Sequence, residues 1–153
     1  MLRALTPLLF LAACASGGAN APSSPTAALN EEFTLAPGQT ATVNGANLRL
    51  TFERVREDSR CPTGVTCIWE GDAVVVLKVK VEASETTREV HTQGGSSRSR
   101  NAPAGDYMVT LVRLEPVPSS AGTIAASAYR ATLRVGPSDG SGDAALTVAP
   151  VDQ

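Results

Sequence analysis

Apolar and polar residues alternate along much of the chain after residue 30, which is the spacing of strands that present one face to a core. Residues 73–82 are the longest example. Their two faces carry Val75, Leu77, Val79 and Val81 on one side and Lys78, Lys80 and Glu82 on the other. Val74 and Val76 make the first half apolar on both faces. This pattern predicts a central strand that is buried on both sides.

Further segments alternate in the same way and predict further strands. The alternation is clear in residues 47–52, 107–112 and 129–135, and weaker in residues 33–35, 40–43, 88–92 and 145–148. Turn-forming residues separate these segments at 36–38, 44–45, 94–97 and 103–106. Several short strands between such turns predict an all-β fold, namely a single domain that is an antiparallel β-sandwich or barrel-like.

The apolar phase slips by one residue within two of these segments, Leu50–Val55 and Val109–Leu114. A β-bulge inserts one extra residue into a strand, so it shifts every later side chain to the opposite face. We therefore expect bulges near Arg54 and Arg113.

Residues 1–13 have the organisation of a secretory signal peptide, with Arg3 followed by an apolar run that is too short to span a bilayer. The run ends in Leu11-Ala12-Ala13-Cys14, which resembles the lipobox of bacterial lipoproteins. The resemblance implies that Cys14 becomes the N-terminus and carries lipid such as palmitate. An ordinary signal peptide followed by a chance cysteine is the alternative. Ala15 replaces the aspartate that retains such lipoproteins in the inner membrane, which implies the outer membrane if the cell has two.

The rest of the chain divides by composition. Residues 14–30 are rich in Ala, Ser, Gly and Pro and predict a flexible tether behind the lipidated cysteine. Residues 31–136 form the expected β-sandwich domain, and residues 137–153 a low-complexity tail with one extra strand as an option. The chain has 153 residues, 42% of them hydrophobic, and a net charge of −2. These values predict a globular domain and no nucleic-acid partner.

Two of the three cysteines and the only tryptophan lie in residues 57–72, EDSRCPTGVTCIWEGD. A redox site would need a closer Cys-x-x-Cys pair, and a zinc site would need two more ligands from a chain with one histidine. Export to an oxidising compartment instead predicts a disulfide between Cys61 and Cys67. Closing this short loop stabilises the fold by roughly 2.4 kcal/mol.

Trp69 is placed two residues after Cys67, so in an extended chain the two side chains share a face. We predict that the indole packs on the disulfide as part of the core, because the chain is poor in aromatic residues. The alternative is an exposed anchor for a partner.

Three acids around the disulfide, Asp58, Glu70 and Asp72, are candidate binding residues together with Trp69, and Glu57 joins them as a candidate Ca²⁺ ligand. A loop closed by a disulfide can gather carboxylates for Ca²⁺. The simpler expectation is that Asp58 pairs with Arg60 or caps the loop while the other acids face water. We therefore predict no metal site and no cofactor.

The residues around the disulfide also resemble a group of uncharacterised bacterial secreted proteins and lipoproteins. The matching runs are Asp58-Ser59-Arg60-Cys61-Pro62, Gly64-Val65-x-Cys67-Ile68-Trp69 and Gly71-x-Ala73, with similar flanking features over residues 31–136. Glu70 replaces the small residue that usually follows the tryptophan in that group. The resemblance implies a β-domain in the envelope and no particular biochemical activity.

The sequence offers little for catalysis. His91 is the only imidazole, and we expect it on the surface. No hydrolase, metalloprotease or phosphate-loop motif is present. We therefore expect a lipid-anchored envelope module with no catalytic residue, which binds an envelope protein, a polymer or a small ligand or has a structural role. The alternative is a hydrolase or metal-binding protein that uses the acids near the Cys61–Cys67 loop.

Overall fold

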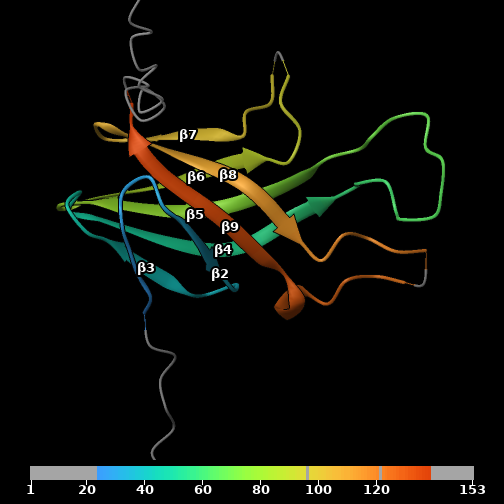
Figure 1. The fold of residues 1–153 in the computed structure, drawn as a ribbon, viewed down its shortest axis with the longest axis horizontal. Helices are drawn as coiled ribbons and strands as arrows, with labels where there is room; N and C mark the ends of the chain where they lie inside the picture. Colours follow the sequence, from blue (N-terminus) through green and yellow to red (C-terminus); the bar gives the residue numbers. More distant parts are fainter. Residues whose placement is uncertain (1–23, 96, 121, 139–153) are drawn as a thin grey trace, which may run out of the picture.

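The computed structural model describes residues 24–95, 97–120 and 122–138. These residues form nine strands and one 3₁₀ helix (Figure 1). In chain order they are β1 (Thr26–Ala27), β2 (Glu32–Leu35), β3 (Thr40–Val43), β4 (Leu48–Asp58), β5 (Ala73–Val81), β6 (Ser84–His91), β7 (Asn101–Ala104), β8 (Tyr107–Glu115), η1 (Ala126–Ala128) and β9 (Arg130–Pro137). None of the helices described here is long and apolar enough to cross a membrane.

The strands make two sheets that pack face to face (Figure 1). One sheet has the order β1-β3-β4-β5-β6 and the other β2-β9-β8-β7. All pairs are antiparallel except β1 with β3, which is parallel. Within the described ranges the two sheets share no paired strand. The predicted all-β fold is therefore confirmed in its sandwich form rather than its barrel form.

The core lies between the sheets and consists of the inward residues of each alternating strand. Its largest fully buried side chains include Phe52, Leu50 and Leu77 from the first sheet and Leu111 and Leu133 from the second. β5 lies between β4 and β6, and its residues Val74 to Leu77 are all buried. The prediction of a central strand whose first half is buried on both faces is confirmed.

Both predicted bulges are present. The register of β4 against β5 shifts between Phe52 and Arg54, and that of β8 against β9 shifts between Leu111 and Arg113. A second shift in β4 lies between Val55 and Glu57. Bulges bend a strand and increase its twist, so each of these strands bends shortly before the long loop that follows it.

The structure adds pairings that the sequence did not predict. β1 lies within residues 14–30, the segment assigned to the tether, and its pairing with β3 joins residues 26–27 to the first sheet. β7 includes Pro103 and Ala104, which were predicted as a turn, and β6 begins at Ser84 rather than residue 88. The signal peptide, Cys14 and the optional strand at 145–148 lie outside the described residues.

The sandwich has two unlike ends. At the end that we call the turn end, short turns at 44–47, 82–83 and 105–106 join neighbouring strands. At the other, the loop end, lie three longer connections, residues 59–72, 92–100 and 116–129. The first and third of these project beyond the sheets, at the right of Figure 1.

Candidate binding site at the loop end

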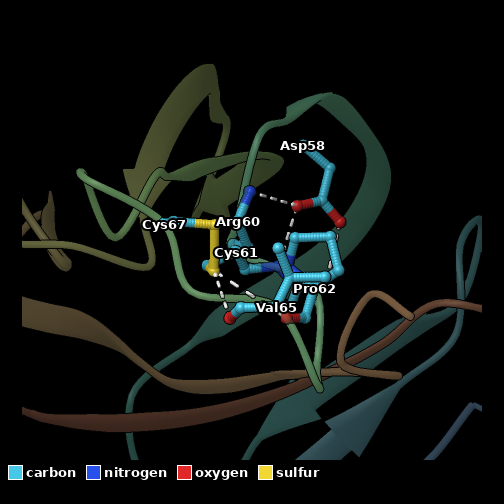
Figure 2. Close-up of a disulfide and its surroundings, with 6 residues drawn as sticks. All are labelled: Asp58, Arg60, Cys61, Pro62, Val65 and Cys67. Carbon is cyan, nitrogen blue, oxygen red and sulfur yellow. Dashed lines mark hydrogen bonds and ion pairs between the residues drawn. A yellow bond between two sulfur atoms is a disulfide. The ribbon is translucent and has the colours of Figure 1, made fainter. Parts of the chain in front are cut away.

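The connection between β4 and β5 is a disulfide-closed loop. Cys61 and Cys67 are bonded, with their Cα atoms 6.0 Å apart (Figure 2). Between the disulfide and the sheet, backbone hydrogen bonds continue the pairing of β4 with β5. Ser59 N–H donates to the carbonyl of Asp72 at 2.7 Å, and Cys61 N–H donates to the carbonyl of Glu70 at 3.0 Å. The predicted disulfide is confirmed, and it closes the apex of a hydrogen-bonded hairpin.

Gly71 is required where this hairpin narrows. Its φ is +69°, in the left-handed region that favours glycine. A Cβ atom at this position would lie 1.8 Å from the carbonyl oxygen of Ser59, which belongs to the backbone of the opposing strand. Only glycine therefore lets the two sides of the loop approach as closely as they do.

Asp58 and Arg60 form the clasp, a nearly buried ion pair at the base of the loop (Figure 2). The carboxylate of Asp58 accepts hydrogen bonds from Arg60 Nε at 2.8 Å, Nη2 at 2.7 Å and the backbone N–H at 3.2 Å. The guanidinium also donates to the carbonyls of Leu114 at 2.6 Å and Pro116 at 2.9 Å. The predicted Asp58–Arg60 pair is confirmed, and it connects the first sheet to the end of β8 in the second.

Two further contacts tie the 116–129 connection to the disulfide loop. Tyr129 donates its hydroxyl to Asp58 Oδ2 at 3.0 Å, and Thr63 N–H donates to the carbonyl of Pro118 at 2.9 Å. Burial and the adjacent Asp58 carboxylate raise the pKa of Tyr129. Burial alone would raise the pKa of Asp58, but the bonds from Arg60 and Tyr129 outweigh it and the pKa is lowered. Asp58 therefore has a structural role as the acceptor for Arg60 and Tyr129, and its carboxylate is not a surface group that binds a ligand.

Trp69 is exposed, and the prediction that it packs in the core is wrong. Its residue exposure is 83%, and that of the neighbouring Ile68 is 91%. The two residues lie beyond the last β4–β5 pair, Asp58 with Ala73, where no second sheet covers the loop. Val65 and Val117 are also exposed, on the same loop and on the adjacent 116–129 connection. We call Val65, Ile68, Trp69 and Val117 the apolar tip.

Asp72 and His91 are also placed differently from expectation, since neither faces water freely. Asp72 Oδ2 lies 2.6 Å from His91 Nδ1, and Asp72 Oδ1 accepts bonds from Thr92 Oγ1 at 3.0 Å and Gln93 N–H at 3.1 Å. Arg98 Nε is 3.9 Å from the same carboxylate. The pairing of His91 with Val74 in β5–β6 places the imidazole beside Asp72, a neighbour that chain order does not reveal.

An open pocket of about 460 Å³ lies between the disulfide loop and the 92–100 connection. Its lining residues are Ser59, Trp69, Glu70, Gly71, Asp72, Gln93, Gly94 and Arg98. The structure thus brings together three of the predicted binding residues, Trp69, Glu70 and Asp72, and leaves Asp58 in the clasp. Gln93 and Arg98 were missed because they join the site only through the pairing of β6 with β5.

The acids of this region do not gather around one point. No group of three or more metal-ligating side chains occurs in the part of the chain that the structure describes. Asp58 and Asp72 lie in separate hydrogen-bond networks, while Glu70 is exposed beside Trp69. The arrangement offers an indole face, a guanidinium, an amide and a free carboxylate around an open pocket, which are groups that bind a ligand.

Comparisons of the chain with family models, curated proteins and solved structures gave no match.

The exposure of Trp69 predicts a small effect on stability. We expect Trp69→Ala to change the free energy of unfolding by no more than about 0.5 kcal/mol, because surface truncations create no cavity. Phe52→Ala, which empties a fully buried position, is the control and should cost about 3–5 kcal/mol. Urea denaturation followed by circular dichroism measures both. A loss of several kcal/mol in Trp69→Ala would mean that the indole packs in a core.

The carboxylates of Asp58 and Asp72 predict that the protein loses folding stability at acid pH. Burial raises the pKa of Asp72, but bonds from His91, Gln93 and Thr92 outweigh it, so its pKa, like that of Asp58, is lowered in the folded state. A lowered pKa contributes stability that is present above the unfolded value of about 3.9 and is lost as pH falls through the folded value. We expect the urea midpoint to fall below about pH 4. Asp72→Asn should flatten this fall, whereas the exposed Glu70→Gln should not; equal slopes in all three proteins would contradict the assignment.

Proposed function

We propose that this protein is a lipid-anchored binding module of the bacterial cell envelope, in the outer membrane where the cell has two, and that the loop end holds its binding surface. The observation that carries the proposal is Trp69, a large aromatic side chain that is exposed on a loop closed by a disulfide. Aromatic side chains of this kind are common anchors of binding sites.

The loop that carries Trp69 is held in place before any ligand arrives. The disulfide, the clasp and the close approach at Gly71 each restrict it. Holding a binding loop in one conformation reduces the conformational entropy that is lost on association. A stiff loop with an exposed apolar tip therefore supports a binding role better than a role in the core.

The point of attachment supports the same role. The first paired residue of the described chain is Thr26, in β1. Thr26 pairs with Thr42 of β3, and Thr42 pairs with Arg49 near the start of β4, so the chain enters the sheet beside the start of β4. Asp58, at the other end of β4, is about nine residues or 30 Å farther on. A lipid at Cys14 is about 12 residues, or at most about 43 Å of chain, before Thr26. Because the chain enters the fold near the turn end, this anchor leaves the loop end free to meet a partner.

The same geometry supports binding over hydrolysis or metal binding. A carboxylate that acts as a general base or cation ligand needs free oxygen lone pairs directed into a cleft. Asp58 and Asp72 already accept several hydrogen bonds each, and a guanidinium or imidazole lies against each of them.

Photo-crosslinking in native membranes tests the proposed surface. A benzophenone amino acid replaces Ile68 at the loop end and, as a matched control, Ser84 at the turn end, which is also exposed. We expect a discrete crosslinked product from position 68 and none from position 84. Equal labelling from both positions, or labelling from position 84 alone, would contradict a binding surface at the loop end.

Metabolic labelling tests the anchor separately. A fatty-acid analogue should label the parent chain and not Cys14→Ser, because Cys14 is the proposed acylated residue. Labelling that persists in Cys14→Ser would show that the lipid is attached at another residue.

A further inference from the structure

We propose that the pocket beside Trp69 binds a neutral carbohydrate, with one sugar ring lying on the indole face; this inference rests on the proposed binding function and names its ligand class. Three features carry it: the aromatic platform, the mixture of hydrogen-bonding groups around it and the balance of charge in the pocket.

The platform is the exposed ring of Trp69. The face of an aromatic ring carries partial negative charge, and the C–H bonds on one face of a pyranose ring present partial positive charge and little polarity. Flat stacking therefore matches both shape and charge. The ring is available for it, since Trp69 is 83% exposed and borders a pocket that opens to solvent.

The groups next to the indole match hydroxyl groups. A sugar hydroxyl both donates and accepts, so a site needs both kinds of partner. Arg98 supplies donors, Glu70 supplies acceptors and the amide of Gln93 supplies both. Arg98 Nε forms an ion pair with Asp72 Oδ2 at 3.9 Å, which is longer than a hydrogen bond, and its side chain is 55% exposed, so the guanidinium is accessible to a ligand. The pocket volume of about 460 Å³ lies within the usual range of small-ligand sites, about 300–1,000 Å³.

The composition of the pocket favours a sugar over an apolar protein anchor. Trp69 is its only large apolar side chain, while Ile68, Val65 and Val117 are not among the lining residues. Protein-binding hot spots have the opposite arrangement, a dry apolar centre with a polar rim. Glu70 and Asp72 outnumber Arg98 in the lining, so an anionic ligand would meet net repulsion. The ligand is therefore a neutral saccharide.

Trp69 makes this inference directly measurable, because it is the only tryptophan in the chain. The full chain, purified from membranes in detergent, is titrated with cellotetraose, maltotetraose and tetra-N-acetylchitotetraose while tryptophan emission is recorded. We expect a saturable change with at least one of them, and no change with tetragalacturonate, their anionic counterpart. No saturable change with any neutral probe, or stronger binding of the anionic one, overturns the inference.

Variants locate the bound sugar. Arg98→Ala keeps the fluorescent reporter and should weaken binding about five- to tenfold through lost hydrogen bonds. Trp69→Ala, followed by isothermal titration calorimetry, should abolish measurable binding, and Trp69→Phe should restore part of it. Ile68→Ala is the matched control, since it is adjacent and exposed but does not line the pocket, and should bind like the parent.

The two proposals fail in different ways. A chain that crosslinks through position 68 but binds no saccharide keeps its binding function and loses the carbohydrate assignment, and the apolar tip is then a protein-docking surface. Equal weakening of saccharide binding by Ile68→Ala and Arg98→Ala would also contradict the pocket as the place where the sugar binds.

Discussion

Replacing Arg60 by methionine is expected to lower the free energy of unfolding by about 3 kcal/mol, because it leaves a nearly buried carboxylate without its cation. The side chains of Asp58 and Arg60 are only 10% and 11% exposed. The substitution also removes both bonds from the guanidinium to the carbonyls of Leu114 and Pro116, so the link that Arg60 makes to the end of β8 is lost with the ion pair. Methionine keeps most of the apolar stem, which limits the effect of lost packing. Urea denaturation at pH 7 measures the change.

An exposed ion pair on β8 provides the control. Arg113 lies 3.7 Å from Glu115, with both side chains 56% exposed, and exposed pairs contribute at most about 1 kcal/mol. Arg113→Met should therefore have little effect. Adding Asp58→Asn to Arg60→Met should recover part of the loss, because a neutral amide tolerates burial better than an unpaired carboxylate. A loss below about 1 kcal/mol in Arg60→Met would show that the clasp is not a structural element.

Replacing Gly71 by alanine is expected to destabilise the fold by about 3 kcal/mol or more, beyond the roughly 1–2 kcal/mol of a left-handed conformation alone. The new Cβ would meet the Ser59 carbonyl carbon at 2.6 Å and its oxygen at 1.8 Å. Since these are backbone atoms of the opposing hairpin strand, relief requires the loop to open. The same opening would displace Trp69 from the pocket.

Gly64→Ala is the control that introduces the backbone strain of a positive φ without a steric clash. Gly64 lies inside the same disulfide loop with φ +80°, and a Cβ there would meet no atom within 4 Å. We expect it to lose only about 1–2 kcal/mol. Thermal unfolding of both variants and the parent gives the comparison. Equal losses from Gly71→Ala and Gly64→Ala would mean that the hairpin does not narrow at Gly71 as the structure shows.

Short edge strands escaped prediction for identifiable reasons. β7 is four residues long and contains Pro103, which lacks a backbone donor and so weakens any strand pattern. It is tolerated because β7 is at the edge of its sheet and pairs only with β8. β1 has two residues, too few for any alternation to be visible.

The residues of the candidate site also fall into two groups, those that local sequence predicts and those that depend on long-range contacts. Cys61 and Cys67 were predicted to pair because the cysteine count, export and a short loop agree, all of which are local properties. Trp69 was placed wrongly because residue spacing tells which side chains share a face, but not whether another element covers that face. Asp72 was predicted to face water, although its partners His91 and Gln93 come from the end of β6 and the connection after it.

Sequence pattern alone was enough to predict the all-β class, every strand except β1 and β7, one bulge each in β4 and β8, the disulfide and the Asp58–Arg60 pair. Each of these depends on alternation, turn residues or neighbours a few positions apart. The three-dimensional fold was needed to see that the disulfide loop extends past the sheets and that Trp69 is therefore exposed to solvent. It also decided that Arg98 and Gln93 face the loop that carries Trp69. The physical reason is that burial and long-range contact depend on where two sheets end relative to each other. That relation is set by the register of β4, β5 and β6 and by the packing of the second sheet against them.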